Sequence, residues 1–465
     1  MKKPYSKNEK VVQYVELLSS NPAVTIMLSF AAVIVLGSVL FLFPFTAKDG
    51  HGLSVINALF ESTSAVCVTG LIVVDTVTHF NFIGQFILLI LIQTGGLGIM
   101  ILSFFTLYVM RRQVSINDKI FLSTILSEED SGQLFDALKT IIITTFVIES
   151  CGAIFLLIGL IPKLGFSLQI IWYAIFHSVS GFCNAGFALF PDSLESFTNN
   201  PVIILSIALL IILGSLGFGT ITNIKAWFFS WKNRKKYKET KRVKLSLNTQ
   251  IVLLGTGVLI FGGALVLYGL EYTNALKNLP TWQQYLAAFF QSITMRTAGF
   301  SSITYEHLHT GTYLFLCILM FIGAASGGTG GGIKINTLSI ILAAFTSFLH
   351  GEKKVHLHKY EIDYNKVIEA FLVLTTAIAI IGVGTIILCF TEQFSLIKVL
   401  FEIVSAMGTV GVSSGITSHL SMVGRIVVII IMFWGRIGVL TMLSVASIRE
   451  DPVKFSWPRA DISIG

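Results

Sequence analysis

The sequence predicts an all-α polytopic membrane protein, in which four like helical modules follow one another along the chain and surround one central axis. Three observations lead to this fold class. The composition is strongly apolar, eight apolar runs are long enough to cross a bilayer, and one short glycine-terminated segment occurs four times.

The composition is that of a membrane protein. Of the 465 residues 54% are hydrophobic and only 12% are charged, and the mean hydropathy is +0.80, whereas a soluble domain has about 25% charged residues. The five cysteines show neither the spacing of a disulfide framework nor that of a zinc site. The first apolar run begins near Pro22 and is too long for a signal-peptide core, so it is interpreted as a membrane anchor. We therefore expect a multi-pass protein of the cell membrane.

Eight apolar runs reach the roughly 20 residues that span a hydrocarbon core about 30 Å thick. They cover 23–46, 82–110, 139–161, 201–230, 248–270, 312–348, 366–390 and 422–448. Between the two runs of each pair lies a shorter semi-apolar piece, at 53–65, 169–181, 282–294 and 396–407. These pieces are too short to cross the membrane, and each runs into a glycine. This pattern is typical of a re-entrant half-helix followed by an extended return.

The repeated segment marks a whole module that is used four times. Its copies are Phe60–Gly70, Phe176–Gly186, Phe290–Gly299 and Phe401–Gly411, with final glycines 112 to 116 residues apart. Solenoid repeats are much shorter, at about 20–50 residues. The predicted modules are 23–111, 139–231, 248–349 and 366–448, each with the order helix, pore helix, filter segment, helix. They lie between an N-terminal segment, 1–22, and a tail, 449–465.

The basic residues indicate the orientation in the membrane. Most of the 32 Lys and Arg lie at the two chain ends and in the connections 111–139, 225–244 and 353–366, while the alternate connections hold few. By the positive-inside rule both termini are cytoplasmic, and the short helices enter from the outside. The net charge of +7 is thus explained by topology, and no nucleic-acid partner is expected.

The repeated glycines suit a cation pore. An ion that enters a narrow pore loses water, and backbone carbonyls can replace that water without adding full charges. Carbonyls can all face one axis only where some residues adopt conformations that glycine tolerates, and no acidic residue lies within three positions of these glycines. We therefore expect K⁺ to bind at the filter glycines. The predicted filter residues are Val68, Thr69, Gly70, Asn184, Ala185, Gly186, Thr297, Ala298, Gly299, Thr409, Val410 and Gly411.

Other polar residues of the repeat are expected to support the filter. Glu61, His177, Gln291 and Glu402 share the position after the repeated Phe, and we expect them to bond to the backbone rather than to relay protons. Arg296 is expected to turn behind the filter. The second helix of each module also carries a G-x-x-G pair, at Gly95/Gly98, Gly214/Gly217, Gly327/Gly330 and Gly435/Gly438. Close helix packing by small residues and a role in the pore both explain these pairs.

The third module departs from the pattern at mid-membrane depth. Six glycines in the ten residues 323–332 are incompatible with a continuous helix, because each costs about 1 kcal/mol there. We expect an unwound loop over 323–337 that lies below the filter and acts as a gate. Its expected gate residues are Gly327, Gly328, Gly330, Gly331, Gly332 and Lys334. The loop is not a phosphate-binding loop, because Ile333 separates the last glycine from the lysine.

Arg436 places a charge inside the eighth apolar run, where a charge is costly and by default functional. One interpretation is a fixed positive charge that contributes a barrier to the ion or pairs with the loop carbonyls. The other is an arginine that holds two helices together through backbone carbonyls.

Together, the filter ends, the stretch Met295–Phe300, the stretch Gly327–Thr337 and Arg436 resemble the Trk/Ktr/HKT superfamily of potassium transporters, and the Ktr-type membrane subunits most of all. The resemblance covers nearly the whole chain. It implies potassium uptake through a pore, with one filter glycine in each module, the intramembrane loop as gate and Arg436 near it. It also implies a non-enzymatic protein without a cofactor of its own, with K⁺ as cargo and Na⁺ as a further candidate.

The resemblance implies partners as well. Members form homodimers in the lipid bilayer, each subunit with its own pore, and work with a separate cytosolic ring of RCK-type nucleotide-binding subunits (KtrA-like). The basic stretch Lys225–Lys244 and the tail are candidate docking surfaces for such a ring.

Two other functions are compatible with the composition. A coupled transporter of organic solutes would be expected to show inverted repeats and acidic residues at the membrane midplane, whereas these repeats are parallel. The chain could also be the potassium-binding subunit of an ATP-driven pump, which would be supported by co-purification with a P-type ATPase.

Overall fold

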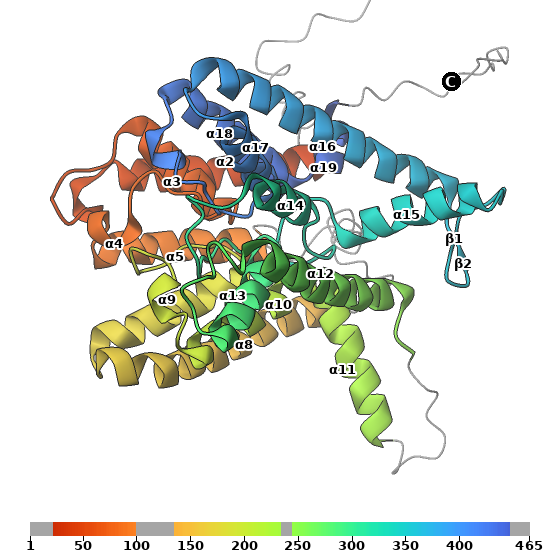
Figure 1. The fold of residues 1–465 in the computed structure, drawn as a ribbon, viewed down its shortest axis with the longest axis horizontal. Coiled ribbons are helices and arrows are strands. Elements are labelled where there is room, and N and C mark those ends of the chain that lie inside the picture. Colours follow the sequence, from red (N-terminus) through yellow and green to blue (C-terminus); the bar gives the residue numbers. More distant parts are fainter. Residues whose placement is uncertain (1–21, 99–133, 234–243, 447–465) are drawn as a thin grey trace, which may run out of the picture.

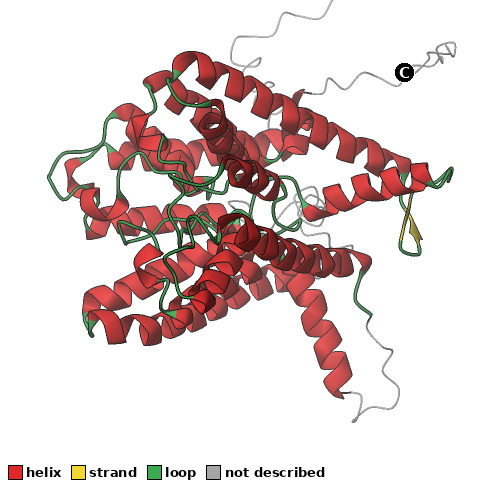
Figure 2. Cartoon of the chain, viewed as in Figure 1, coloured by secondary structure: helices red, strands yellow, loops and turns green. Residues whose placement is uncertain are grey.

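The computed structural model describes residues 22–98, 134–233 and 244–446, and the regular secondary structure of these residues is almost entirely helical (Figures 1 and 2). The predicted N-terminal segment up to residue 21, the tail, residues 99–110 of the second apolar run and residues 234–243 of the basic stretch lie outside the described residues. In Figure 2 the loops gather near the centre of the surrounding helices.

The elements follow one order four times along the chain. The first group holds α2 (Pro22–Phe41), η1 (Pro44–Thr46), α3 (Val55–Val66), α4 (Thr76–His79) and α5 (Phe82–Leu97); the second holds α8 (Leu134–Leu164), α9 (Leu168–Cys183), η2 (Glu195–Phe197), α10 (Pro201–Ser215) and α11 (Phe218–Asn233). The third holds α12 (Leu247–Glu271), α13 (Thr281–Thr294), α14 (Thr310–Phe321) and α15 (Ile335–Leu349), followed by the hairpin of β1 (His356–Leu357) and β2 (Tyr360–Glu361). The fourth holds α16 (Tyr364–Thr391), α17 (Leu396–Gly408), η3 (Thr417–His419), α18 (Met422–Ile437) and α19 (Val439–Ala446).

The helices form a closed ring. Each of the short helices α3, α9, α13 and α17 packs against the first helix of its own group. It also packs against a helix of the preceding group, in the pairs α5 with α9, α10 with α13, and α14 with α17. The contact between α18 and α3 joins the last group to the first. The four short helices therefore point their ends into one shared centre.

Polar caps determine where several second helices begin. The Asn81 side chain accepts a hydrogen bond from the Gly84 amide (3.0 Å) and starts α5, and Ser421 does the same for Gly424 (3.2 Å) in α18. Asn200 caps α10, whose first residue is Pro201. A cap satisfies amides that have no partner inside the helix, so these residues position the start of each helix.

Four single helices among the described residues are long and apolar enough to cross a membrane, and each is the first helix of its group: α2, α8, α12 and α16. Two other predicted runs are wrong as continuous helices. Run 201–230 is bent by 98° between α10 and α11, and run 422–448 is bent by 95° between α18 and α19. The bends occur at Gly217 and Gly438, whose φ angles of 81° and 91° are left-handed. The eight-span layout and the cytoplasmic termini remain predictions.

In three of the G-x-x-G pairs the first glycine allows close packing, and the second glycine ends the helix. A Cβ added at Gly95, Gly214 or Gly435 would collide with the carbonyl of Val66, Phe182 or Met407, at the end of a short helix. The packing interpretation therefore fits the first glycine of these three pairs. The second glycine ends the helix, because Gly98, Gly217 and Gly438 all have left-handed φ angles.

Candidate ion pathway

The four filter segments share one backbone conformation. In each, the glycine and the residue two positions before it have left-handed φ angles. The values are 55° and 91° at Val68 and Gly70, 60° and 71° at Asn184 and Gly186, 71° and 79° at Thr297 and Gly299, and 49° and 95° at Thr409 and Gly411. Left-handed backbone is unfavourable for residues other than glycine. Its recurrence at equivalent positions indicates a conformation that the surrounding ring of helices imposes.

The four filter glycines contact one another around the centre. A Cβ added at Gly70 would lie 3.1 Å from the Cα of Gly186, and one at Gly186 would lie 2.9 Å from the Cα of Gly299. A Cβ added at Gly299 would lie 3.3 Å from the Cα of Gly411, and one at Gly411 would lie 2.9 Å from the Cα of Gly70. Each added Cβ would also approach the carbonyl that precedes the next glycine; these carbonyls belong to Thr69, Ala185, Ala298 and Val410. The four predicted filter glycines are therefore adjacent to one another, and the carbonyl before each glycine lies beside a neighbouring glycine.

Hydroxyl groups that are not among the predicted site residues hold the filter segments in place. The Ser64 hydroxyl accepts a hydrogen bond from the Gly70 amide (3.0 Å), and Ser405 does the same for Gly411 (3.1 Å). In the middle two segments the hydroxyl donates instead, from Ser180 to the Phe187 carbonyl (2.7 Å) and from Thr294 to the Phe300 carbonyl (2.8 Å). The detectable signal was a Ser or Thr five or six positions before each glycine.

The residues after the repeated Phe bind the segments that return from the filter. A Glu61 oxygen accepts hydrogen bonds from the amides of Val73 (2.8 Å) and Val74 (3.2 Å), and the His177 Nε2 accepts one from Leu189 (3.1 Å). Gln291 bonds to Ser302 (3.2 Å), and Glu402 bonds to Ser413 (3.0 Å) and Thr417. Glu61 and His177 therefore bond to the backbone as expected, whereas these contacts of Gln291 and Glu402 are made to side-chain hydroxyls.

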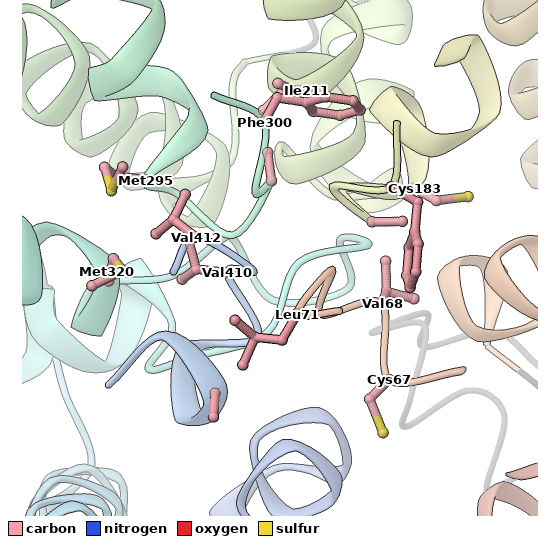
Figure 3. Close-up of a cluster of buried hydrophobic side chains, with 14 of the residues drawn as sticks. Cys67, Val68, Leu71, Cys183, Ile211, Met295, Phe300, Met320, Val410 and Val412 are labelled. Atoms are coloured by element: carbon pink, nitrogen blue, oxygen red, sulfur yellow. The ribbon is translucent and has the colours of Figure 1, made fainter. Parts of the chain in front are cut away.

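Apolar packing surrounds the filter from behind. Figure 3 shows side chains such as Val68, Leu71, Val410 and Val412 around the filter segments, and all four are at most 2% exposed. The Arg296 side chain is 2% exposed and does not line the outer cavity described next. The filter is thus embedded in a packed core that resists widening.

A cavity of about 410 Å³ opens on one side of the glycine ring. Its lining includes all four filter glycines and four carboxylates, Asp75, Asp192, Glu195 and Glu306. None of the described residues that line it is Lys or Arg. Burial, together with the charges of Asp192 and Glu306, raises the pKa of Glu195. The cavity is therefore an acidic vestibule, which attracts cations to the ring.

The interruption of the third group lies on the other side of the filter. Residues 322–334 leave the helix between α14 and α15. A Cβ added at Gly330 or Gly331 would collide with the Thr297 or Thr409 side chain, so the loop lies directly against two filter segments. The predicted end of this gate loop at residue 337 is wrong, because α15 already begins at Ile335, after the last glycine of the run.

The gate loop is attached to the second group at the bend of its helix. The Ala325 amide donates to the Ser215 carbonyl (3.0 Å), and the Thr329 amide donates to Gly214 (3.1 Å). In return, the Phe218 amide donates to the Gly327 carbonyl (3.2 Å). Because the last carbonyls of a helix have no partner within it, the loop satisfies groups that the bend at Gly217 exposes.

Two cations hold the gate loop. Lys334 donates to the Gly330 carbonyl (2.6 Å) and the Gly331 carbonyl (3.3 Å), within the loop itself. Arg436 donates to the loop carbonyl of Thr329, and also to the carbonyls of Gly95 and Gly96 at the end of α5. Arg436 therefore pairs with a loop carbonyl and also joins two helices through backbone carbonyls, so the contacts named in both interpretations are present.

Comparison with known proteins identifies the family. Residues 5–457 match the family model described as "TrkH: Cation transport protein". The chain belongs to this family. It is 37% identical over 442 residues to the Ktr system potassium uptake protein B of Vibrio alginolyticus, and this alignment covers 95% of this chain and 94% of the relative. It is 34% identical over 450 residues to the protein of the same name from Bacillus subtilis, and this alignment covers 96% of this chain and 97% of the relative.

A solved structure supports the fold of this TrkH-family chain. The potassium transporter TrkH from Vibrio parahaemolyticus superimposes with a TM-score of 0.70 at 18% identity, over 91% of this chain and 84% of that one. The predicted family is confirmed, and with it a multi-pass membrane protein that is a cation transporter and not an enzyme.

Proposed function

We propose that this chain takes up K⁺ across the cell membrane as the pore subunit of a Ktr-like system. The observation that carries the proposal is the ring of four filter glycines with a backbone carbonyl before each of them, between an acidic vestibule and a loop held by two cations. Carbonyl rings replace the hydration shell of K⁺. The names of the relatives, which are potassium uptake proteins, support the same cargo.

The ion path follows the order of these parts. A cation enters the vestibule from outside, loses water at the carbonyls of Thr69, Ala185, Ala298 and Val410, and then meets the gate loop. In the described conformation the loop lies against the filter segments, so passage requires the loop to move. The gate residues are Gly327, Gly328, Gly330, Gly331, Gly332, Lys334 and Arg436. Na⁺ is a second candidate cargo, because only one glycine ring provides selectivity.

The layout and the partners belong to the same proposal. Each of the four modules contributes one membrane span before and one after its short helix, the bent and interrupted helices included, and both termini are cytoplasmic. The chain forms a homodimer, in which each subunit has its own pore. A cytosolic RCK-type ring (KtrA-like) would set the position of the gate loop, and no cofactor is bound by this chain.

The direct test is rubidium uptake into vesicles that contain the purified chain. Uptake into K⁺-loaded vesicles should be inhibited by external K⁺ much more strongly than by Na⁺, and not by choline. Deletion of residues 326–331 should raise the uptake, because it removes the part of the loop that lies against the filter. The proposal is wrong if the deleted chain folds and still carries no alkali cation.

The acidic vestibule predicts a dependence on pH and salt. Because burial raises the pKa of Glu195, this carboxylate loses its charge at a higher pH than an ordinary glutamate. Uptake from dilute K⁺ should therefore fall as the outside becomes weakly acidic. Replacing Asp75, Asp192, Glu195 and Glu306 with their amides should lower uptake by roughly threefold or more at low ionic strength, and much less at high salt. The matched control neutralises Glu361 and Asp363, which lie outside the vestibule.

A further inference from the structure

A second cavity lies on the outer side of the helix ring, where the last group meets the first. It has a volume of about 300 Å³ and lies between α2, α3 and α18. Figure 1 shows these helices together, and α3 contacts both of the others. The residues that line this groove are Ala31, Ile34, Val35, Leu59, Thr63, Ile429, Ile430, Phe433 and Trp434.

The described side chains that line the groove have no free polar group that could bind a water molecule. Eight of the nine lining side chains are apolar or aromatic. The exception is Thr63, whose hydroxyl already donates to the Leu59 carbonyl (2.7 Å). A buried water needs two to four polar partners, and this lining does not supply them. An apolar occupant is therefore the better fit.

The groove is continuous with the surface that faces lipid. On α2 the exposed side chains include Leu28, Val35 and Leu36, at 52 to 59% exposure, and on α18 they include Val423 and Ile430, at 50% and 42%. The lining residues of α2, 31 to 35, lie in the middle of a helix that is long enough to cross the membrane. The groove therefore opens at the depth of the hydrocarbon chains rather than at the headgroups.

The size of the groove fits part of one lipid chain. A dry apolar cavity of about 150 Å³ holds one benzene molecule, so this groove has room for roughly twice as many carbon atoms. A complete phospholipid does not fit, but the middle of one acyl chain does. We propose that one acyl chain of a membrane phospholipid binds in the groove between α2, α3 and α18.

The bound chain would contact the helical turn that holds the gate loop. Phe433 and Trp434 form one wall of the groove, and Arg436, two residues later, donates to the Thr329 carbonyl of the loop. The Trp434 carbonyl also accepts the amide of Gly438, where α18 ends. An acyl chain in the groove therefore packs directly against the segment between the lipid surface and the gate.

Fluorescence quenching can test this proposal, because bromine atoms on lipid chains quench tryptophan only at short range. The chain is placed in vesicles of dioleoyl phosphatidylcholine, and in vesicles of the same lipid with brominated acyl chains. The emission of Trp434 is taken as the difference between the natural chain and the Trp434→Phe variant. We expect the brominated lipid to quench at least half of it.

Two neighbouring alanines provide the test variant and its control. Ala31 lines the groove, whereas Ala32 is exposed and does not line it. Ala31→Phe should fill the groove and at least halve the quenching of Trp434, and Ala32→Phe should leave the quenching unchanged. If Ala31→Phe does not fold, Ala31→Leu serves as the smaller replacement.

Two outcomes would overturn the proposal. Equal Trp434 emission in brominated and ordinary vesicles would mean that protein covers the groove, from a second copy or from the residues before Pro22. Equal quenching in the Ala31→Phe and Ala32→Phe variants would mean that Trp434 senses only the bulk lipid. Neither result bears on whether the chain carries potassium, so the proposed function is tested separately.

Discussion

The Gly411→Ala variant is expected to lose most rubidium uptake and much of its preference for K⁺ over Na⁺. Gly411 has a φ of 95°, and a Cβ there would collide with the Thr69 carbonyl and lie 2.9 Å from the Cα of Gly70. The left-handed conformation alone costs an alanine about 1–2 kcal/mol. The collision also displaces a carbonyl of the ring. Because the displaced carbonyl belongs to the ring that binds the ion, and 1.4 kcal/mol of weaker binding in the ring corresponds to a factor of ten, we expect uptake to fall by about tenfold or more.

Gly165→Ala is the matched control for this experiment. Gly165 also has a left-handed φ, of 79°, but an added Cβ would meet nothing within 4 Å. The Gly165→Ala substitution therefore introduces similar backbone strain without adding a contact in the pore. Uptake should remain within about twofold of the natural chain, because the strain acts on stability and not on the ring. Equal losses in both variants would assign the defect to folding and contradict a special role of the ring.

The Arg436→Gln variant is expected to have the opposite effect and to raise uptake. Arg436 donates hydrogen bonds to the Thr329 carbonyl of the loop and to the carbonyls of Gly95 and Gly96. Hydrogen bonds from a charged group are worth about 1.5–3 kcal/mol each. Losing the one to the loop should raise the ratio of open to closed loops by roughly ten- to a hundredfold. The measurement is the initial rate of rubidium uptake per folded protein.

Arg425→Gln is the control on the same helix. Arg425 donates to Asn57 (2.5 Å) and to the Ser418 carbonyl (3.0 Å), and it has no contact with the loop. Its removal should leave uptake nearly unchanged. Reduced uptake in folded Arg436→Gln, with normal uptake in Arg425→Gln, would show that Arg436 assists passage instead of closing the path.

The local parts of the site could be predicted because they repeat. The short helices were expected at 53–65, 169–181, 282–294 and 396–407, and the structure has helices at Val55–Val66, Leu168–Cys183, Thr281–Thr294 and Leu396–Gly408. Their ends follow from the glycine of each repeat, which is a signal within about ten residues. The interruption of the third group was equally local, because its glycines are adjacent in the chain.

The bends at Gly217 and Gly438 could not be predicted, because they depend on distant residues. A glycine within a helix costs only about 1 kcal/mol, and both glycines lie within mostly apolar runs. The bend at Gly217 forms where the gate loop, more than a hundred residues later, bonds to the carbonyls of Gly214 and Ser215. The cyclic order of contacts around the ring is likewise a property of the assembled helices.

The proposed gate loop offers a reason why the four modules are joined in one polypeptide. The loop comes from the third module, bonds to the second at Gly214 and Ser215, and is held from the fourth by Arg436. Four identical subunits around an axis would place four such loops in a space that accommodates one. When the four modules are joined in one polypeptide, the sequence of each module can change independently of the others. A single obstruction can then be kept in one quarter, while the carbonyl ring above it retains its approximate symmetry.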